Sequence, residues 1–282
     1  MSSTGNNACG WALLVVLAIS FTDSRAVDGN ASPDAAGFGA LPAQTRPALS
    51  PDGHWLAWID YQESRPRVVI LDIEARRVLR TMRSDKAGIG SLGWCSNRIL
   101  LIFTGETGRA GSALMAVDVT TGDARPLLSS SAYLVASRIS KPDTVIMAES
   151  PRLMEVDART GNATMIKMGN AHTVAWAVNR DGQPLAREDW DYTRQYRLYA
   201  LSGNSIKELL RRDEADRAVL KGVLADGSAL VLLAPHDGHQ AAWALPLDGS
   251  PLRLLAEVAG LDVTDVHFDP NTGAVIGVYV LW

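Results

Sequence analysis

The stretch Leu49-Ser50-Pro51-Asp52-Gly53-His54-Trp55-Leu56-Ala57-Trp58 joins a tight turn to a short apolar run. In Ser-Pro-Asp-Gly, proline presets φ for the second position of a turn, aspartate accepts a backbone hydrogen bond, and glycine takes the position with positive φ. The run that follows is rich in Trp and aliphatic residues and too short for a helix, which predicts a β-strand. Weaker copies of this unit recur along the chain, and their repetition indicates the fold.

The spacing of the turn glycines gives the period of the repeat. The later turn of successive units contains Gly122, Gly161, Gly203 and Gly249, at steps of 39, 42 and 46 residues. The earlier Asp-Gly turns place Gly182 and Gly227 45 residues apart, and Gly273 follows 46 residues later. A period of about 40–45 residues with four strands per unit is typical of β-propeller blades. A helical solenoid does not fit the short apolar runs, and a β-sandwich would not need the same strand order five times.

We therefore predict an all-β chain that forms a β-propeller of four-stranded blades, with five blades and part of a sixth. The expected blades lie near residues 47–82, 89–128, 131–168, 171–211, 217–256 and, in part, 262–282. Residues 27–46 are predicted to be a linker or an extended lead-in. Propellers usually close with four to eight complete blades. Because the sixth unit contains only part of a blade, this propeller is expected to be open or incomplete. Unpaired sheet edges then predict poor solubility or oligomerisation of the isolated chain.

The first 26 residues have features of a secretory signal peptide. Residues 12–21 form an apolar core of ten residues, too short to span a bilayer as a helix, and Ser24-Arg25-Ala26 offers small residues before a cleavage site at Val27. Residues 1–10 carry no Lys or Arg, unlike the usual positive start of a signal peptide. We predict export to the periplasm or the medium; an uncleaved membrane anchor and a start codon assigned too far upstream stay open as alternatives.

Composition limits the classes of function. The 282 residues are 47% hydrophobic and 21% charged, which is typical of a globular protein, and the net charge of −4 comes without a basic block. This argues against a nucleic-acid partner. Cys9 falls within the signal segment, which leaves Cys95 unable to form an intrachain disulfide or a cysteine-based metal site. Cys95 is predicted to be a small buried side chain, and we predict no cofactor.

Three local motifs contain residue types that could carry chemistry. Residues 90–93, Gly-Ser-Leu-Gly, only approach the Gly-x-Ser-x-Gly nucleophile elbow, and they are predicted to belong to a strand with turn glycines. Residues 236–239, His-Asp-Gly-His, suggest a metal site, but no third ligand is indicated and a solvated hairpin turn is favoured. Residues 188–192, Glu-Asp-Trp-Asp-Tyr, suggest an exposed acidic loop that could contact a partner or a peptide's amino terminus. We assign no catalytic, cofactor-binding or metal-binding residue.

Several of these motifs also occur in a particular order. The residues concerned are Leu41-Pro42, Pro47 to Ala57, Gly93-Trp94, Asn97 to Leu100, Ala116 to Asp118, Thr121-Gly122 and Phe268 to Val278. Taken together, and placed after a signal segment, they resemble the amino-terminal propeller of bacterial serine peptidases of the prolyl oligopeptidase family. This family includes dipeptidyl aminopeptidases and acylaminoacyl peptidases. The resemblance extends from about Leu41 to Val278.

The resemblance implies a peptidase lineage. Family members carry an α/β-hydrolase domain with a Ser/Asp/His triad after the propeller, and the propeller restricts access to short peptides. Nothing in this sequence matches that domain, so no catalytic residue is carried over. The leading hypothesis is the substrate-gating propeller of an exported serine peptidase, truncated before its hydrolase domain and inactive alone, with peptides or that missing domain as partners. The alternative is a non-enzymatic periplasmic propeller that binds a protein or peptide. Membrane contact is expected only through an uncleaved signal segment.

Overall fold

The computed structural model describes residues 44–61, 65–83, 88–105, 113–127, 132–137, 140–191, 195–213, 218–269 and 272–281. Within these ranges the regular elements are β-strands, arranged as five four-stranded antiparallel sheets and one two-stranded sheet. The predicted propeller of five blades and part of a sixth is thereby confirmed. None of the residues in these ranges belongs to a helix that could span a membrane. The predicted signal peptide lies outside the described residues.

The sheets follow the order of the chain. The first three contain β1 (Gln44–Leu49), β2 (Trp55–Asp60), β3 (Arg67–Asp72) and β4 (Arg77–Arg83); β5 (Ile89–Trp94), β6 (Ile99–Thr104), β7 (Ala113–Asp118) and β8 (Ala124–Leu127); and β9 (Tyr133–Ala136), β10 (Thr144–Glu149), β11 (Arg152–Asp157) and β12 (Ala163–Met168). The others contain β13 (Thr173–Val178), β14 (Pro184–Trp190), β15 (Gln195–Ser202) and β16 (Ser205–Asp213); β17 (Val219–Val223), β18 (Ala229–His236), β19 (His239–Pro246) and β20 (Arg253–Ala256); and β21 (Val263–Phe268) with β22 (Val275–Val280).

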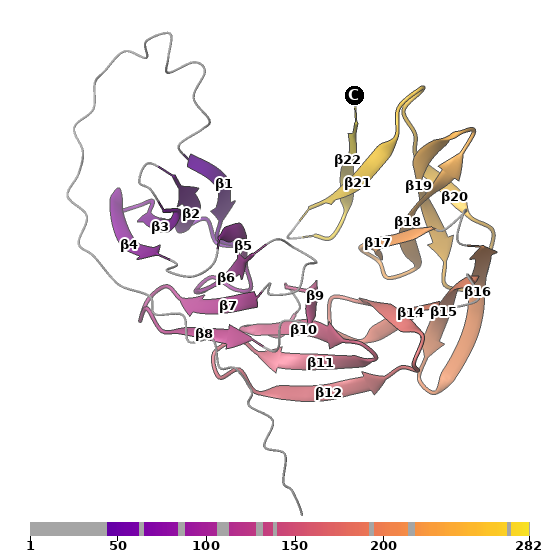
Figure 1. The fold of residues 1–282 in the computed structure, drawn as a ribbon, viewed down its shortest axis with the longest axis horizontal. Helices are drawn as coiled ribbons and strands as arrows, with labels where there is room; N and C mark the ends of the chain where they lie inside the picture. The colour runs from indigo at the N-terminus through magenta and orange to yellow at the C-terminus, as the bar shows by residue number, and fades with distance from the viewer. Residues whose placement is uncertain are drawn as a thin grey trace, which may run out of the picture.

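The six sheets form an open arc, and in the four-stranded sheets the first strand lies on the inside and the last on the outside (Figure 1). The two ends of the arc are the first sheet and the β21–β22 pair. Apolar side chains fill the space between each sheet and the next, in five separate clusters. Each sheet is thus held mainly by its neighbours, as in a repeat protein.

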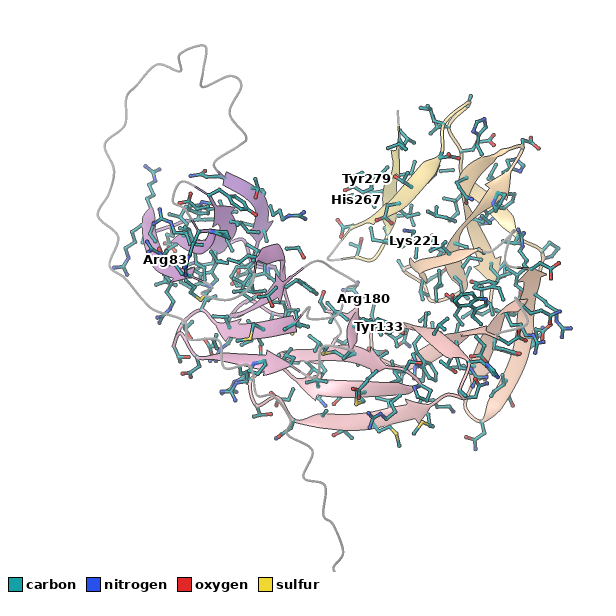
Figure 2. The ribbon with its side chains drawn as sticks, in the orientation of Figure 1. Arg83, Tyr133, Arg180, Lys221, His267 and Tyr279 are labelled. Atoms are coloured by element: carbon teal, nitrogen blue, oxygen red, sulfur yellow. The ribbon has the colours of Figure 1, made fainter. Side chains whose placement is uncertain are left out.

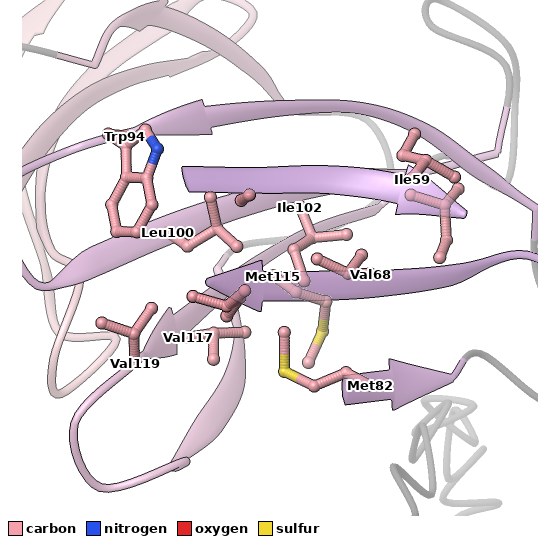
Figure 3. Packing of buried hydrophobic residues seen from close by; sticks show 12 residues of the cluster. Ile59, Val68, Met82, Trp94, Leu100, Ile102, Met115, Val117 and Val119 are labelled. Carbon is pink, nitrogen blue, oxygen red and sulfur yellow. The ribbon is translucent and has the colours of Figure 1, made fainter. Parts of the chain in front are cut away.

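The cluster between the first two sheets shows how the strands supply this core (Figure 3). Ile59 and Val68 come from the first sheet, and Trp94 and Leu100 come from the second. The Trp94 indole also donates a hydrogen bond to the Ala48 carbonyl oxygen on β1, 3.0 Å away. In the next cluster, between the second and third sheets, Cys95 is buried as the sequence predicted.

The turn that opens the first sheet has the predicted geometry. The Gly53 amide donates to the Ser50 carbonyl at 2.9 Å, and Gly53 has a φ of 74°. The buried Ser50 hydroxyl donates to Asp52 at 2.6 Å and accepts from the Trp55 amide at 2.9 Å. Ser50 and Asp52 therefore fix both the turn and the first residue of β2. The strand before this turn, β1, begins at Gln44.

A second turn recurs between the third and fourth strands of the first three sheets. Asp118 and Asp157 each accept backbone hydrogen bonds from the residues two and three positions later, and the glycine four positions later donates back to the aspartate carbonyl at 2.7 Å. Asp72 similarly accepts from the Ala75 amide at 2.9 Å. In this first sheet the position with positive φ is held by Arg76, with a φ of 51°. A left-handed conformation is unfavourable for a residue with a Cβ.

Exchanging the residues at this left-handed position is expected to change stability in opposite directions. Arg76→Gly should raise the free energy of unfolding by about 0.5–1 kcal/mol, because it removes the clash of Cβ in the left-handed region. Gly161→Ala should lower it by about 1 kcal/mol; its φ is 76° and the nearest atom to a new Cβ would be 3.8 Å away, so strain in φ is the main effect. Denaturant unfolding of both variants measures this, and a shift of the same sign in both would contradict it.

Basic side chains of the outer strands connect neighbouring sheets. Each donates to a carbonyl oxygen of the turn between the third and fourth strands of the next sheet: Arg80 to Val119 and Thr120, Arg125 to Thr160, Lys167 to Gly203, and Lys207 to Asp248. The distances run from 2.5 to 3.4 Å. These contacts repeat at the period of the blades, and they add polar connections between the outer strands of neighbouring sheets.

Arg253 is the next member of this series. It lies on β20, four residues after Gly249, just as Lys207 lies four residues after Gly203. The sheet beside β20 has two strands in the part of the chain that the structure describes, so no turn between a third and a fourth strand receives Arg253 there. The β22 strand at the end of the arc is uncharged, with Ile276 and Tyr279 exposed. Oligomerisation through such an edge stays a prediction.

The inter-sheet contact predicts a difference between two arginines. Arg80→Met should lower the free energy of unfolding by about 1–2 kcal/mol, because two charged hydrogen bonds of 2.7 and 2.8 Å are lost. Arg253→Met should change it by less than about 0.5 kcal/mol, as expected for a surface substitution. Both variants keep most of the aliphatic bulk, so chemical denaturation compares mainly the polar contacts of the two guanidinium groups. Equal losses would show that the contacts to the turn carbonyls do not contribute.

Candidate functional site

A pocket of about 390 Å³ lies on the inner side of the arc. Its walls come from the first strands of the third, fourth and fifth sheets, β9, β13 and β17, and from Phe268 and Gly273 of the β21–β22 hairpin. Figure 2 labels Tyr133, Arg180 and Lys221 on this inner side. The volume falls within the range of small-ligand pockets in proteins. Four of the six sheets thus contribute to one concave site.

The pocket is bordered by strand edges as well as by side chains. Its lining includes consecutive residues: 133–136 of β9, 175–180 of β13 and the turn after it, and 220–225 of β17 and the turn after it. Successive side chains of a strand point to opposite faces, so a run of neighbours reaches the pocket through the backbone edge. β9, β13 and β17 are each the terminal strand of their sheet. Their inner edges therefore border the pocket with backbone groups, and on β13 the Tyr133 hydroxyl already occupies the Val174 carbonyl.

The walls are mostly apolar, with Ala175, Leu220 and Val223 among them. The Phe268 ring lies against β17 at Gly222, where a Cβ would come within 2.9 Å of the ring. Glycine at this position therefore lets the β21–β22 hairpin approach the fifth sheet and close one side of the pocket.

Of the residues that the structure describes around the pocket, two are charged, and both are basic. The Lys221 ammonium is 3.0 Å from an Asp265 carboxylate oxygen, which balances its charge. Arg180 is exposed, and the described residues give its guanidinium neither an ion pair nor a hydrogen bond. Its backbone carbonyl accepts from the Ser140 amide at 2.6 Å, which fixes the main chain at this point. The pocket thus carries one unbalanced positive charge at its rim.

Tyr133 connects the third and fourth sheets where they form a wall of the pocket. Its hydroxyl donates to the Val174 carbonyl at 3.1 Å. Partial burial raises the pKa of Tyr133, and the nearby charge of Glu188 raises it further, so the hydroxyl stays protonated at neutral pH. Tyr133 is therefore a neutral donor that ties β9 to β13. It supplies no base or nucleophile to the pocket.

His267 and Tyr279 form an aromatic contact across the β21–β22 pair, on the face turned away from the fifth sheet (Figure 2). The Tyr279 hydroxyl and His267 Nδ1 are 2.9 Å apart, and the two rings meet edge to face at 5.5 Å between centroids. The contact joins the two strands of the incomplete sheet. Tyr279 remains 53% exposed, so half of its ring is available to other molecules.

The serine and histidine motifs of the sequence lie in a strand and in a hairpin turn, where they have structural roles. Ser91 lies within β5, which continues without a strand-to-helix elbow. His236 and His239 are paired across the β18–β19 hairpin, and Asp237 and Gly238 at its tip both have positive φ, as a two-residue hairpin requires. The predicted hairpin turn is confirmed. Among the described residues, no group of three His, Cys, Asp or Glu side chains could hold a metal ion.

The acidic motif at residues 188–192 was wrongly predicted to be an exposed loop. Glu188 and Asp189 belong to β14, and both are buried, at 3% and 5% exposure. Asp189 accepts hydrogen bonds from Arg187, Asn170 and Thr173 at 2.8–2.9 Å. Because these donors compensate its charge, the carboxylate can lie inside the sheet. Tyr192 lies outside the described residues.

The pocket itself was missed by sequence reasoning. The turn from Asn179 to Gly182 was identified, and the structure confirms it with a 3.0 Å hydrogen bond from the Gly182 amide to the Asn179 carbonyl. Nothing in the local sequence indicated that Arg180 in this turn faces a cavity. Its neighbours in the pocket come from strands about 40 residues before and after it, which only the repeat brings together.

One curated relative supports the resemblance. The chain is 24% identical over 265 residues to dipeptidyl aminopeptidase BIII of Pseudoxanthomonas mexicana, covering 85% of this chain and 37% of that protein. It is a distant homologue, and it spans little more than a third of that relative's length. No family model matches the sequence.

Solved structures show the same fold. The β-propeller domain of the trilobed protease from Pyrococcus furiosus matches with a TM-score of 0.52 and 14% identity, over 80% of this chain and 75% of that one. An acylaminoacyl peptidase in complex with Z-Gly-Gly-Phe-chloromethyl ketone matches with a TM-score of 0.51 and 12% identity, over 81% of this chain and 41% of that one. These matches and the distant homology confirm the predicted resemblance to peptidase propellers.

Proposed function

We propose that this chain is the substrate-gating propeller of an exported serine peptidase of the prolyl oligopeptidase family, and that it has no peptidase activity alone. The distant homology to dipeptidyl aminopeptidase BIII carries the proposal, because it runs through 85% of this chain but only 37% of the relative. The remaining part of such a peptidase would be an α/β-hydrolase domain that supplies the catalytic serine.

The inner side of the arc supports a role in handling peptides. The pocket has apolar walls for side chains, and the inner edges of β9, β13 and β17 offer main-chain hydrogen-bonding groups. An extended peptide satisfies its own backbone by pairing with such an edge. The propeller would then select short peptides before they reach the hydrolase domain.

The proposal is tested on the native protein in the cells that produce it. An antibody raised against the chain should detect, in the exported fraction, a protein more than twice the chain's 30.3 kDa that reacts with a fluorophosphonate probe for active serines. The purified chain itself should neither react with the probe nor cleave dipeptidyl chromogenic substrates.

Three results would overturn the proposal or a part of it. A native protein that runs at the mass of the chain and does not react with the probe would indicate a non-enzymatic binding propeller. Labelling of the purified chain by the probe, with turnover that the probe abolishes, would show that the chain is itself a peptidase. Detection only in the cytoplasmic fraction would contradict export.

A further inference from the structure

We infer that the inner pocket binds the carboxyl-terminal segment of a short peptide, with Arg180 pairing with the terminal carboxylate. This adds a ligand class to the proposed function. It does not depend on catalysis, because it concerns binding to the chain itself, so its test and the probe-labelling test above fail independently.

The charge balance of the pocket points to an anion. Of the charged lining residues, Lys221 is balanced by Asp265 at 3.0 Å, whereas Arg180 has no acidic partner among the described residues. No Asp or Glu is among the described residues that line the pocket. A guanidinium can bind a carboxylate through two parallel, charge-assisted N–H···O bonds. The anion is therefore expected to be a carboxylate attached to an apolar body.

The strand edges point to a peptide rather than a small acid. Residues 175–178 of β13 and 220–223 of β17 reach the pocket consecutively, so their backbone edges border it. An extended peptide can pair with such an edge, whereas a small organic acid leaves its main-chain groups unused. Both β13 and β17 are terminal strands of their sheets.

The position of Arg180 sets the direction of the peptide. β13 ends at Val178, and Arg180 follows two residues later in the turn from Asn179 to Gly182. The Asn179 side chain accepts from the amides of Asp181 and Gln183 at 3.0 and 2.9 Å, which holds this turn in place. A peptide with its carboxylate at Arg180 therefore runs parallel to β13. Its apolar side chains would lie against the apolar walls of the pocket.

Calorimetric titration of the chain with three probes tests the inference. These are acetyl-Ala-Ala-Phe with a free carboxylate, the same peptide as its carboxyl-terminal amide, and 3-phenylpropionate. The free-acid peptide should bind at least about tenfold more tightly than the other two, because a charge-assisted hydrogen bond and the backbone pairing each contribute. Arg180→Gln should remove that preference for the acid over the amide. Arg77→Gln, an exposed arginine on the outer strand β4, is the matched control and should retain it.

Hydrogen exchange locates the site. The free-acid peptide should slow exchange of β13 and β17 amides and leave the outer strands β4 and β8 unchanged. Equal binding of acid and amide, or unchanged binding by Arg180→Gln, would overturn the role of Arg180. Equal binding of 3-phenylpropionate would overturn the peptide assignment. Absence of binding by the free-acid peptide to a chain with a cooperative melt would overturn both.

Discussion

Asp189→Ala is expected to lower the free energy of unfolding by about 3–5 kcal/mol, because it leaves a buried charge without its partner. Asp189 is 5% exposed and Arg187, on the same face of β14, is 9% exposed. The two side chains form an ion pair at 2.8 Å, and Asn170 and Thr173 complete the hydrogen bonds of the carboxylate. The Arg187 guanidinium also lies 5.3 Å from the centre of the Tyr199 ring, which cannot replace the carboxylate.

Two comparisons isolate this effect in urea unfolding. The double variant Asp189→Leu with Arg187→Met should recover much of the lost stability, because apolar side chains can replace a buried pair without an unpaired charge. Glu208→Ala removes an exposed ion pair with Arg211 and should cost less than about 1 kcal/mol. If Asp189→Ala were as mild as Glu208→Ala, water would have to reach the pair, and the site would not be a closed core.

The same residues explain where sequence reasoning failed. Glu188 and Asp189 break the apolar pattern of a strand, so composition alone places them on the surface. The compensation comes partly from Arg187, which shares a face with Asp189 because the segment is a strand and not the predicted loop, and partly from Asn170 and Thr173 on the preceding turn and strand. Pairing across strands is set by the fold, and a local pattern does not contain it.

The repeat of the blades could be predicted from the sequence, because its signals are local. The turns at Ser50 and Asp118 depend on residues within a few positions of one another, and their hydrogen bonds are local. Turn glycines and short apolar runs therefore predicted the blades. The inter-sheet contacts of Arg80 and Lys207 and the pocket at Arg180 join residues about 40 positions apart. These features follow from the arc, so they could be recognised only after it was described.

Leu100→Ala tests whether the stability of each sheet depends mainly on its contacts with the adjacent sheets. Leu100 is fully buried in the cluster between the first two sheets (Figure 3). Truncation should lower the free energy of unfolding of this part by about 3–5 kcal/mol, since it removes buried apolar contacts and leaves a cavity between sheets that cannot fully collapse. Ile206→Ala, at a side chain that is 51% exposed on β16, should change stability by less than about 1 kcal/mol.

The sheets that lose hydrogen-exchange protection in Leu100→Ala show whether the arc unfolds sheet by sheet or as one unit. Because each apolar cluster joins only adjacent sheets, Leu100→Ala should speed hydrogen exchange in the first and second sheets most strongly. The fourth and fifth sheets share a separate cluster that includes Leu198 and Leu232, and they should keep most of their protection. Equal acceleration in all sheets would mean that the arc unfolds as one unit. In that case contacts beyond those between neighbouring sheets would have to contribute to its stability.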